Sequence, residues 1–283
     1  MEITKKEIKS INQVLSSQIG ISISADKRSM LELRLSKRIK ELQLININQY
    51  INYIEKNNDE KIILYNLLTT NYTKFFREEY QFKSLMTKII PDLIKKKKEI
   101  SIWSAGCSTG EEPYTIAMIL DHNFDRENFD FKVLATDINT EVLKKARKGI
   151  YSKSKIKNID SNYLYRYFQK GVGKYTGYYK IKEKIRKKIK FQSLNLNTLF
   201  SQKFSQHFDI IFCRNVLIYF NEINRRKVVK EFYRSLNNYG YLILGHSESL
   251  KNNGNHKISL KKTDTNIYQK QKQTRRVFNG KSI

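Results

Sequence analysis

The spacing of hydrophobic and polar positions changes along the chain. Up to about residue 86, apolar residues recur at helical intervals, with no glycine between Gly20 and Gly106 and no proline before Pro91. The stretch 25–40 is predicted to form one of these helices. Beyond Pro91, short apolar runs alternate with helical segments. The pattern therefore predicts a helical N-terminal domain followed by an α/β domain.

The α/β part is predicted to be a doubly wound sheet. Strands are predicted over 100–103, 131–136, 208–213 and 240–244, and helices over 111–121, 141–147 and 225–236. Strands that alternate with helices form a parallel sheet with helices on both faces. A lysine-rich stretch containing Gly171, Gly173 and Gly177 interrupts the alternation with short apolar–polar steps. We expect it to form a small antiparallel β-subdomain inserted at about 160–191.

These patterns predict a helical domain over 1–86, an α/β domain over 87–270 and a basic, disordered tail over 271–283. No segment has the apolar run of a signal peptide or a membrane span, so we expect a cytoplasmic protein without direct membrane insertion. Cys107 and Cys213 lie far apart, without a CxxC motif or a nearby histidine, so the sequence predicts neither a disulfide nor a metal site.

The strong positive charge of the chain indicates an acidic partner. The chain carries 54 basic and 27 acidic residues, a net charge of +27, which makes nucleic acid a candidate partner. The excess is concentrated in 170–190 and 251–283, each with nine basic residues and one acidic residue. On the predicted helix 25–40, Lys27, Arg34 and Arg38 share one stripe. Such a stripe is either a solvated face or a docking surface for an acidic partner.

The turn after the first predicted strand carries candidate chemistry. Gly106 and Gly110 would let the backbone approach a cofactor closely, but the spacing is not GxGxxG and no Walker lysine follows. Glu111 and Glu112 open the next helix, where carboxylates would repel a pyrophosphate but suit a cofactor with a cationic amino acid end. Asp137 ends the second strand, where it can accept hydrogen bonds from ribose hydroxyls. Together these features favour S-adenosylmethionine.

Six motifs resemble those of the CheR family of chemoreceptor glutamate methyltransferases. They are Asn71–Arg77 (NYTKFFR), Ser104–Tyr114 (SAGCSTGEEPY), Ala135–Asp137 (ATD), Asn195–Leu196 (NL), Phe212–Phe220 (FCRNVLIYF) and Gly245–Glu248 (GHSE). The resemblance implies a class I methyltransferase domain with a Rossmann-like sheet, an all-α N-terminal domain and an inserted β-subdomain. It also implies methyl transfer from S-adenosylmethionine to receptor glutamates, giving S-adenosylhomocysteine and the methyl esters of chemotaxis adaptation.

The resemblance further implies the site residues. It assigns Glu112 to the methionine end of the cofactor and Asp137 to the ribose, with Glu111 left open as an alternative to Glu112. Asn139 stands where the family usually has a second acidic residue. Arg77 and Tyr219 are the implied catalytic residues, and Tyr219 is placed beside the transferred methyl group. The remaining cofactor contacts are Asn71, Thr73, Arg77, Asn195, Leu196, Arg214 and Asn215.

The implied partners are the cytoplasmic helices of methyl-accepting chemoreceptors. Their acidic surface would meet Lys27, Arg34 and Arg38. The loop of Gly171, Gly173 and Gly177 resembles that of family members that bind a C-terminal receptor tether through the β-subdomain. We expect a monomer that binds no nucleic acid.

Two other functions compete with this interpretation. A class I nucleic-acid methyltransferase would explain the charge, but the segment Cys213–Tyr219 lacks the Asn/Asp-Pro-Pro-aromatic turn of enzymes that methylate amino groups of bases. A non-catalytic adaptor would keep the fold without turnover, but Arg77 and Tyr219 are retained.

Overall fold

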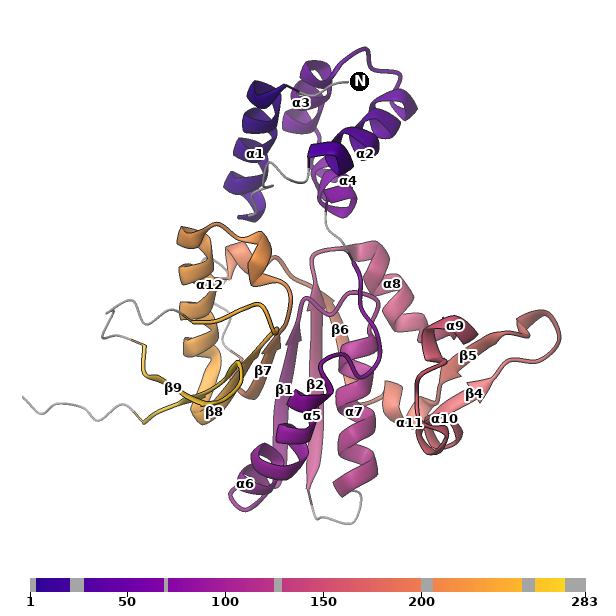
Figure 1. Ribbon diagram of the computed structural model, residues 1–283, viewed down its shortest axis with the longest axis vertical. Coiled ribbons are helices and arrows are strands. Elements are labelled where there is room, and N and C mark those ends of the chain that lie inside the picture. The colour runs from indigo at the N-terminus through magenta and orange to yellow at the C-terminus, as the bar shows by residue number, and fades with distance from the viewer. Residues whose placement is uncertain are drawn as a thin grey trace, which may run out of the picture.

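A bundle of four helices stands apart at the N-terminal end of the molecule (Figure 1). The structure is a computed structural model that describes residues 4–20, 28–68, 71–124, 129–199, 206–250 and 258–272. The helices of the bundle are α1 (Lys5–Ile19), α2 (Arg28–Glu41), α3 (Ile47–Lys56) and α4 (Asn58–Leu68). They enclose their own apolar core, which includes Ile11, Leu35 and Tyr50. The helix predicted over 25–40 is confirmed as α2 from Arg28 onward.

A partly buried ion pair joins α2 to α4. The Nε and Nη2 atoms of Arg38 donate to the carboxylate of Glu60 at 2.9 and 2.6 Å, and this bonding raises the pKa of the guanidinium. The Tyr50 hydroxyl donates to the same carboxylate at 2.8 Å, and Glu60 is only 3% exposed. Arg34 donates through Nη1 to the carbonyl oxygen of Leu67. Two of the three residues of the predicted docking stripe therefore bond to α4, and Lys27 lies outside the described residues.

The centre of the molecule is a mixed sheet of seven strands in the order β6-β2-β1-β7-β8-β10-β9. Its strands are β1 (Glu99–Ala105), β2 (Asp130–Asp137), β6 (Ile189–Ser193), β7 (Phe208–Cys213), β8 (Leu236–Leu244), β9 (Leu260–Asp264) and β10 (Ile267–Lys270). The four predicted strands are confirmed as β1, β2, β7 and β8, which pair in parallel. β6 adds a further parallel strand, and β9 and β10 add an antiparallel edge that was not predicted.

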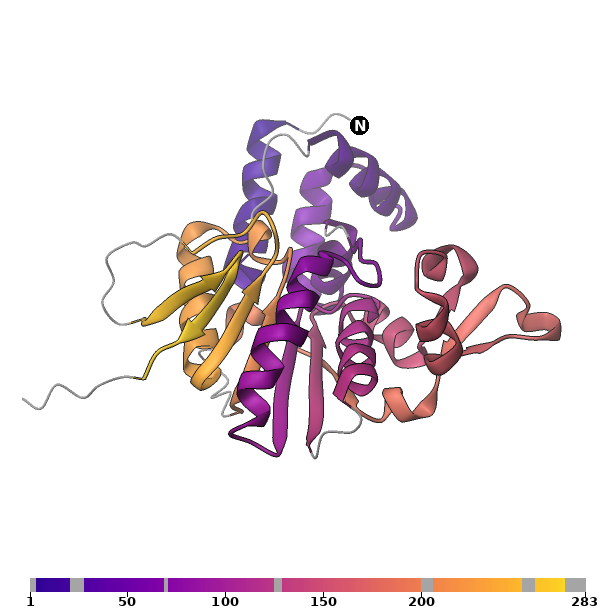
Figure 2. The same ribbon diagram turned by 60° about the horizontal axis from the view of Figure 1, so that its bottom comes forward.

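Helices cover both faces of this sheet, as predicted (Figures 1 and 2). Alternate strand residues point to opposite faces, so Ile102 packs with α5 to α7 on one face while Trp103 packs with α12 on the other. The covering helices are α5 (Glu79–Ser84), the π-helical η2 (Leu85–Ile89), α6 (Ile90–Ile94), α7 (Glu111–Phe124), α8 (Thr140–Lys148) and α12 (Glu222–Ser235). The predicted domain boundary at 86–87 falls inside η2.

The predicted antiparallel β-subdomain is confirmed as a three-stranded sheet in the order β3-β5-β4, which projects to one side (Figure 2). The predicted bounds of about 160–191 were wrong, because the subdomain begins at residue 150 and residues 189–191 form part of β6 in the central sheet. Its elements are β3 (Ile150–Ser152), α9 (Lys153–Ile156), α10 (Ser161–Tyr167), β4 (Phe168–Lys170), the 3₁₀ helix η3 (Gly173–Tyr175), β5 (Tyr178–Ile181) and α11 (Glu183–Arg186). Tyr151, Phe168 and Ile181 bury their side chains in the same core as α7, which anchors the subdomain.

Two amide side chains fix the helical bundle on the sheet domain. The Nδ2 atom of Asn221 donates to Ser16 Oγ at 3.1 Å, and that of Asn224 donates to the Gly20 carbonyl at 3.2 Å. Among the described residues, none of the helices combines the length and apolar character that a membrane span requires. From residue 273 onward, the predicted basic tail lies outside the described part of the chain.

Candidate active site

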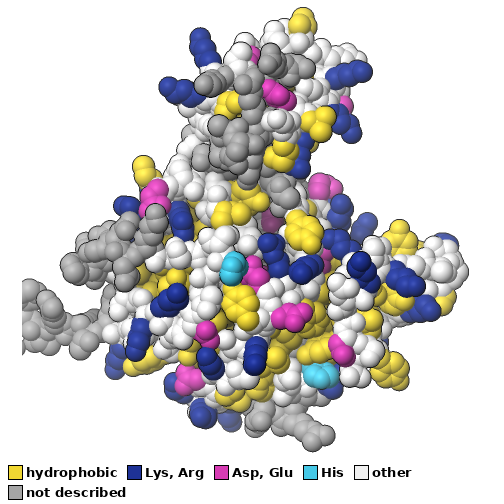
Figure 3. Space-filling view, viewed as in Figure 1, with side chains coloured by type: hydrophobic (Ala, Val, Ile, Leu, Met, Phe, Trp, Pro, Cys, Tyr) yellow, Lys and Arg dark blue, Asp and Glu magenta, His cyan; other side chains and the backbone are white. Residues whose placement is uncertain are grey.

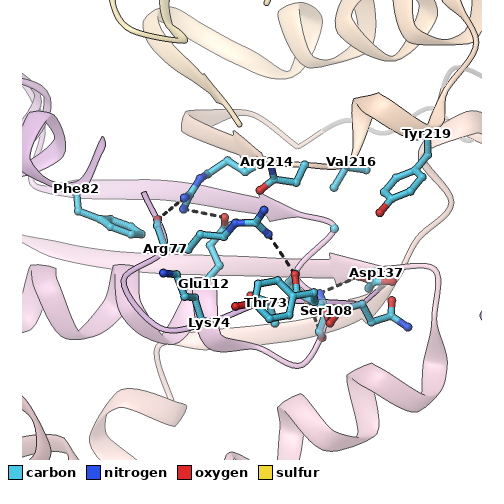
Figure 4. Close-up of a pocket in the computed structure, with 15 residues that line it drawn as sticks. Thr73, Lys74, Arg77, Phe82, Ser108, Glu112, Asp137, Arg214, Val216 and Tyr219 are labelled. Atoms are coloured by element: carbon cyan, nitrogen blue, oxygen red, sulfur yellow. Dashed lines mark hydrogen bonds and ion pairs between the residues drawn. The ribbon is translucent and has the colours of Figure 1, made fainter. Parts of the chain in front are cut away.

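A pocket opens where the parallel strands β1, β2 and β7 end (Figure 4). β1 lies between β2 and β7, so the chain turns to opposite sides of β1, and ligands of doubly wound sheets bind at such a switch point. The pocket encloses about 680 Å³ of empty space, including its open mouth. Its lining residues are Asn71, Tyr72, Thr73, Lys74, Arg77, Phe82, Gly106, Cys107, Ser108, Glu112, Asp137, Arg214, Asn215, Val216 and Tyr219.

The turn between β1 and α7 forms the floor of this pocket. The amides of Gly106 and Cys107 both donate to the carbonyl of Thr136, at 2.8 and 2.9 Å, which fixes the turn against β2. Gly106 has a φ of +85°, and a Cβ there would lie 2.3 Å from Cγ2 of Val216. Glycine is therefore required both by the backbone conformation and by the close approach of the turn after β7.

Asp137 is held in one orientation at the end of β2. Its Oδ2 accepts from the Ser108 amide at 2.8 Å, and its Oδ1 accepts from the Asn139 amide at 2.9 Å. Burial raises the pKa of Asp137, and these amides oppose the increase. Each carboxylate oxygen retains a lone pair for a further donor. Asn139 instead caps α8, because its Oδ1 accepts from the amides of Glu141 and Val142.

The structure distinguishes the two adjacent glutamates at the start of α7. Glu112 lines the pocket, accepts from Ser104 Oγ at 2.7 Å and lies 3.2 Å from Nη1 of Arg214. Burial raises the pKa of Glu112, and the Arg214 charge opposes that shift. Glu111 is fully buried, accepts from Thr109 Oγ1 at 2.6 Å and does not line the pocket. Of these two glutamates, Glu112 is therefore the one that lines the pocket.

The two arginines of the site differ in accessibility. The Arg214 side chain is 2% exposed and bonds to the carbonyl of Arg77 and to Glu112. Its guanidinium also lies 5.3 Å from the ring centre of Phe82. The Arg77 side chain is 29% exposed and donates through Nη1 to the Tyr72 carbonyl at 3.1 Å. Arg214, which directly follows β7, thus links this strand to the segment before α5. Arg77 is the more exposed of the two arginines and stays accessible to a ligand (Figure 4).

Tyr219 closes another side of the pocket. It ends the short 3₁₀ helix η5 (Leu217–Tyr219), which follows a turn at Asn215 with a φ of +58°. Figure 4 shows its hydroxyl directed toward the pocket, across from Glu112. Within η5, Leu217 is buried, whereas Tyr219 is partly exposed toward the pocket that it lines.

Most predicted cofactor residues meet in the pocket, but Asn195 and Leu196 do not line it. Asn195 caps the 3₁₀ helix η4 (Leu196–Thr198) by accepting from the Asn197 amide at 3.0 Å. Leu196 packs in the core under α12. Their contact with the cofactor stays a prediction, although the amide of Leu194 bonds to the carbonyl of Asp137 and keeps this segment beside β2.

Several lining residues were not predicted. Ser108 and Lys74 lie inside two of the motifs, so their position could have predicted that they line the pocket. Nothing in the sequence around Phe82 indicated a site. Cys107 also lines the pocket, and burial raises the pKa of its thiol well above the ordinary value. A neutral buried thiol is a poor nucleophile, so Cys107 is part of the wall. The unpredicted lining residues are Tyr72, Lys74, Phe82, Cys107, Ser108 and Val216.

Comparison with known proteins covers both parts of the chain. Residues 71–267 match the family described as "CheR methyltransferase, SAM binding domain", and residues 6–69 match "CheR methyltransferase, all-alpha domain". A chemotaxis protein methyltransferase of Borreliella burgdorferi is 41% identical over 268 residues, covering 90% of this chain and 92% of the relative. One of Escherichia coli is 37% identical over 244 residues, covering 84% of this chain and 82% of the relative.

Proposed function

The chain belongs to the CheR methyltransferase family, and we propose that it methylates glutamate side chains of chemoreceptors. It is an S-adenosylmethionine-dependent methyltransferase. The names of its relatives, which are chemotaxis protein methyltransferases, support a substrate in chemotaxis, and the glutamate acceptor is what the resemblance of the motifs implies. The observation that carries the proposal is the meeting of Asp137, Glu112, Arg77 and Tyr219 in one pocket at the switch point of the sheet.

The chemistry of the lining residues fits S-adenosylmethionine. Asp137 would accept hydrogen bonds from the ribose hydroxyls, since its carboxylate is fixed by two backbone amides. Glu112 would accept from the ammonium of the methionine end, which carries a complementary charge. Arg77 is able to bind either the cofactor carboxylate or the acceptor carboxylate.

The residues of this site need not remove a proton from the acceptor. S-adenosylmethionine supplies an electrophilic methyl group on a sulfonium. A glutamate side chain has a reference pKa near ~4.3, so at neutral pH it is already an ionised nucleophile. Charge disappears as the ester forms, so exclusion of water helps. The task of Tyr219 and Arg77 is then to orient the carboxylate, and positioning of this kind contributes up to roughly 7–11 kcal/mol in intramolecular reactions.

The proposal is tested with radiolabelled S-adenosylmethionine and two acceptors, a purified chemoreceptor cytoplasmic fragment and bulk RNA. We expect label on the receptor fragment that mild base releases as methanol, since methyl esters hydrolyse readily. Label on RNA would favour the nucleic-acid enzyme. Cofactor binding without label on either acceptor would favour the adaptor.

We further propose that the exposed face of α2 meets the acidic receptor helix. Arg34 and Arg38 bond within the bundle, so reversing their charge would disturb folding as well as docking. The exposed residues of α2 include Lys37 and Lys40, with Leu33 beside them at 76% exposure. These three residues present cations around an apolar side chain, which suits an amphipathic acidic helix.

Replacing both Lys37 and Lys40 with glutamate is expected to slow receptor methylation. Like charges across an interface act mainly on the association rate, so the apparent second-order rate constant should fall and the defect should shrink with added salt. Cofactor affinity should stay unchanged. Lys6→Glu/Lys9→Glu is the matched control, because it reverses two exposed lysines on α1. An equal rate for both double variants at low salt would contradict docking on α2.

The β-subdomain offers a second surface for the receptor. Basic and hydrophobic side chains stand together on this projecting part (Figure 3). Tyr165, Val172, Tyr175 and Tyr178 are between 50% and 87% exposed. We propose that a receptor tether binds here, and that a single protein chain suffices for activity.

A further inference from the structure

One buried carboxylate, that of Glu248, organises the turn after β7. Glu248 is 1% exposed and belongs to the GHSE motif, to which the proposed function gives no role. Its Oε2 accepts from the amides of Gly245 at 2.8 Å and Asn215 at 2.9 Å. Its Oε1 accepts from the amides of Val216 at 3.0 Å and Ile218 at 3.2 Å. A single side chain therefore satisfies four backbone donors.

Three of these donors lie in the turn that carries Arg214 and Tyr219. Asn215 has a left-handed backbone conformation there, which asparagine adopts more readily than most residues other than glycine, and the hydrogen bond from its amide to Glu248 fixes it. Buried amides without an acceptor are costly. Only an ionised carboxylate has enough acceptor sites for all four donors, because an amide side chain in its place would direct hydrogens at some of them.

The segment that carries Glu248 also contacts the other half of the site. The amide of His246 donates to Oε2 of Glu78 at 3.1 Å, and Glu78 directly follows Arg77 in the chain. Gln81 in α5 donates through Nε2 to the Leu244 carbonyl at 2.6 Å. The Nδ2 atom of Asn266 also donates hydrogen bonds to this segment, to the carbonyls of Gly245 at 2.8 Å and His246 at 2.7 Å.

We propose that Glu248 is a positioning residue for methyl transfer. Its carboxylate fixes the turn after β7 and thereby sets the place of the Tyr219 hydroxyl in the pocket. Glu248 does not line the pocket, so it acts through Tyr219 and not on a ligand. The inference rests on the proposed function, because its main measurement is receptor methylation.

Glu248→Gln tests this role with little change in size. We expect kcat to fall about tenfold, since small displacements remote from the reacting atoms have effects of this order or larger. Cofactor affinity should fall less than kcat. Glu248→Asp keeps the charge and should recover part of the lost kcat. Asp209→Asn is the matched control, because Asp209 is 2% exposed and accepts from the Ser101 amide at the opposite end of the sheet. It should lower stability and leave kcat unchanged.

Two measurements separate positioning from a general loss of stability. Hydrogen exchange of the amides of Asn215, Val216 and Ile218 should accelerate in Glu248→Gln but not in Asp209→Asn. The effect of Glu248→Gln on kcat should also be much smaller when Tyr219 is already phenylalanine, since residues that act as a unit are not additive.

The outcomes distinguish this proposal from the proposed function. If the wild-type protein leaves receptor glutamates unmethylated, the proposed function fails, and faster exchange of the three amides would still support the structural part of the inference. If the wild type is active and Glu248→Gln has wild-type kcat, or if its effect adds fully to that of Tyr219→Phe, the role of Glu248 is wrong.

Discussion

Replacing Asp137 with alanine is expected to weaken S-adenosylmethionine binding by more than about tenfold. A hydrogen bond to a charged group contributes about 1.5–3 kcal/mol, and Asp137 would accept more than one from the ribose. The substitution also leaves the amides of Ser108 and Asn139 without their acceptor, so the turn beneath the cofactor loses its anchor. Isothermal titration calorimetry with S-adenosylmethionine and S-adenosylhomocysteine measures the loss directly.

Asp130→Ala is the control for this experiment, since it removes an exposed aspartate from the other end of β2. It should bind the cofactor like the parent. Thermal melting of both variants shows whether each is folded at the titration temperature. Equal affinities of folded Asp137→Ala and the parent would show that Asp137 does not contribute to cofactor binding.

The Tyr219→Phe variant is expected to lose activity while keeping its cofactor. The substitution preserves the ring and deletes the hydroxyl that would orient the acceptor carboxylate. An interaction made mainly in the transition state lowers kcat without a matching change in ground-state binding. We expect a decrease in kcat of about 100-fold, the order found when one positioned hydrogen-bond donor is removed from other active sites.

Tyr239→Phe provides the comparison, because Tyr239 is 43% exposed on β8 and does not line the pocket. Its kcat should match the parent. Single-turnover measurements with saturating cofactor separate the chemical step from product release. A parental rate for Tyr219→Phe in that measurement would leave the tyrosine as part of the pocket wall only.

The sequence predicted four of the five parallel strands, β1, β2, β7 and β8, because they are short apolar runs separated by helices, and it missed β6. β7, predicted over 208–213, has those limits in the structure. β9 and β10 escaped prediction because they are short and contain few apolar residues, and the pairing of β10 with both β8 and β9 identifies them. Long-range pairing of this kind leaves no periodic signal in a single sequence.

The site was predictable where a motif residue points its side chain into the pocket, as Asp137 and Glu112 do. It was not predictable where a residue bonds to another part of the fold, because those partners are distant in sequence. Helical spacing correctly placed Arg34 and Arg38 on one stripe but could not reveal that Glu60 and the Leu67 carbonyl lie opposite. The role of Glu248 was hidden for a similar reason, since its partners are backbone amides and these have no signature in sequence.

The central claim is that this pocket transfers methyl groups to receptor glutamates, and mass spectrometry of a receptor fragment after reaction tests it most directly. The claim predicts methyl esters on glutamate side chains of the receptor helices, removed by mild base and nearly absent with Tyr219→Phe. Methylation confined to lysine, or to RNA supplied in the same reaction, would contradict it.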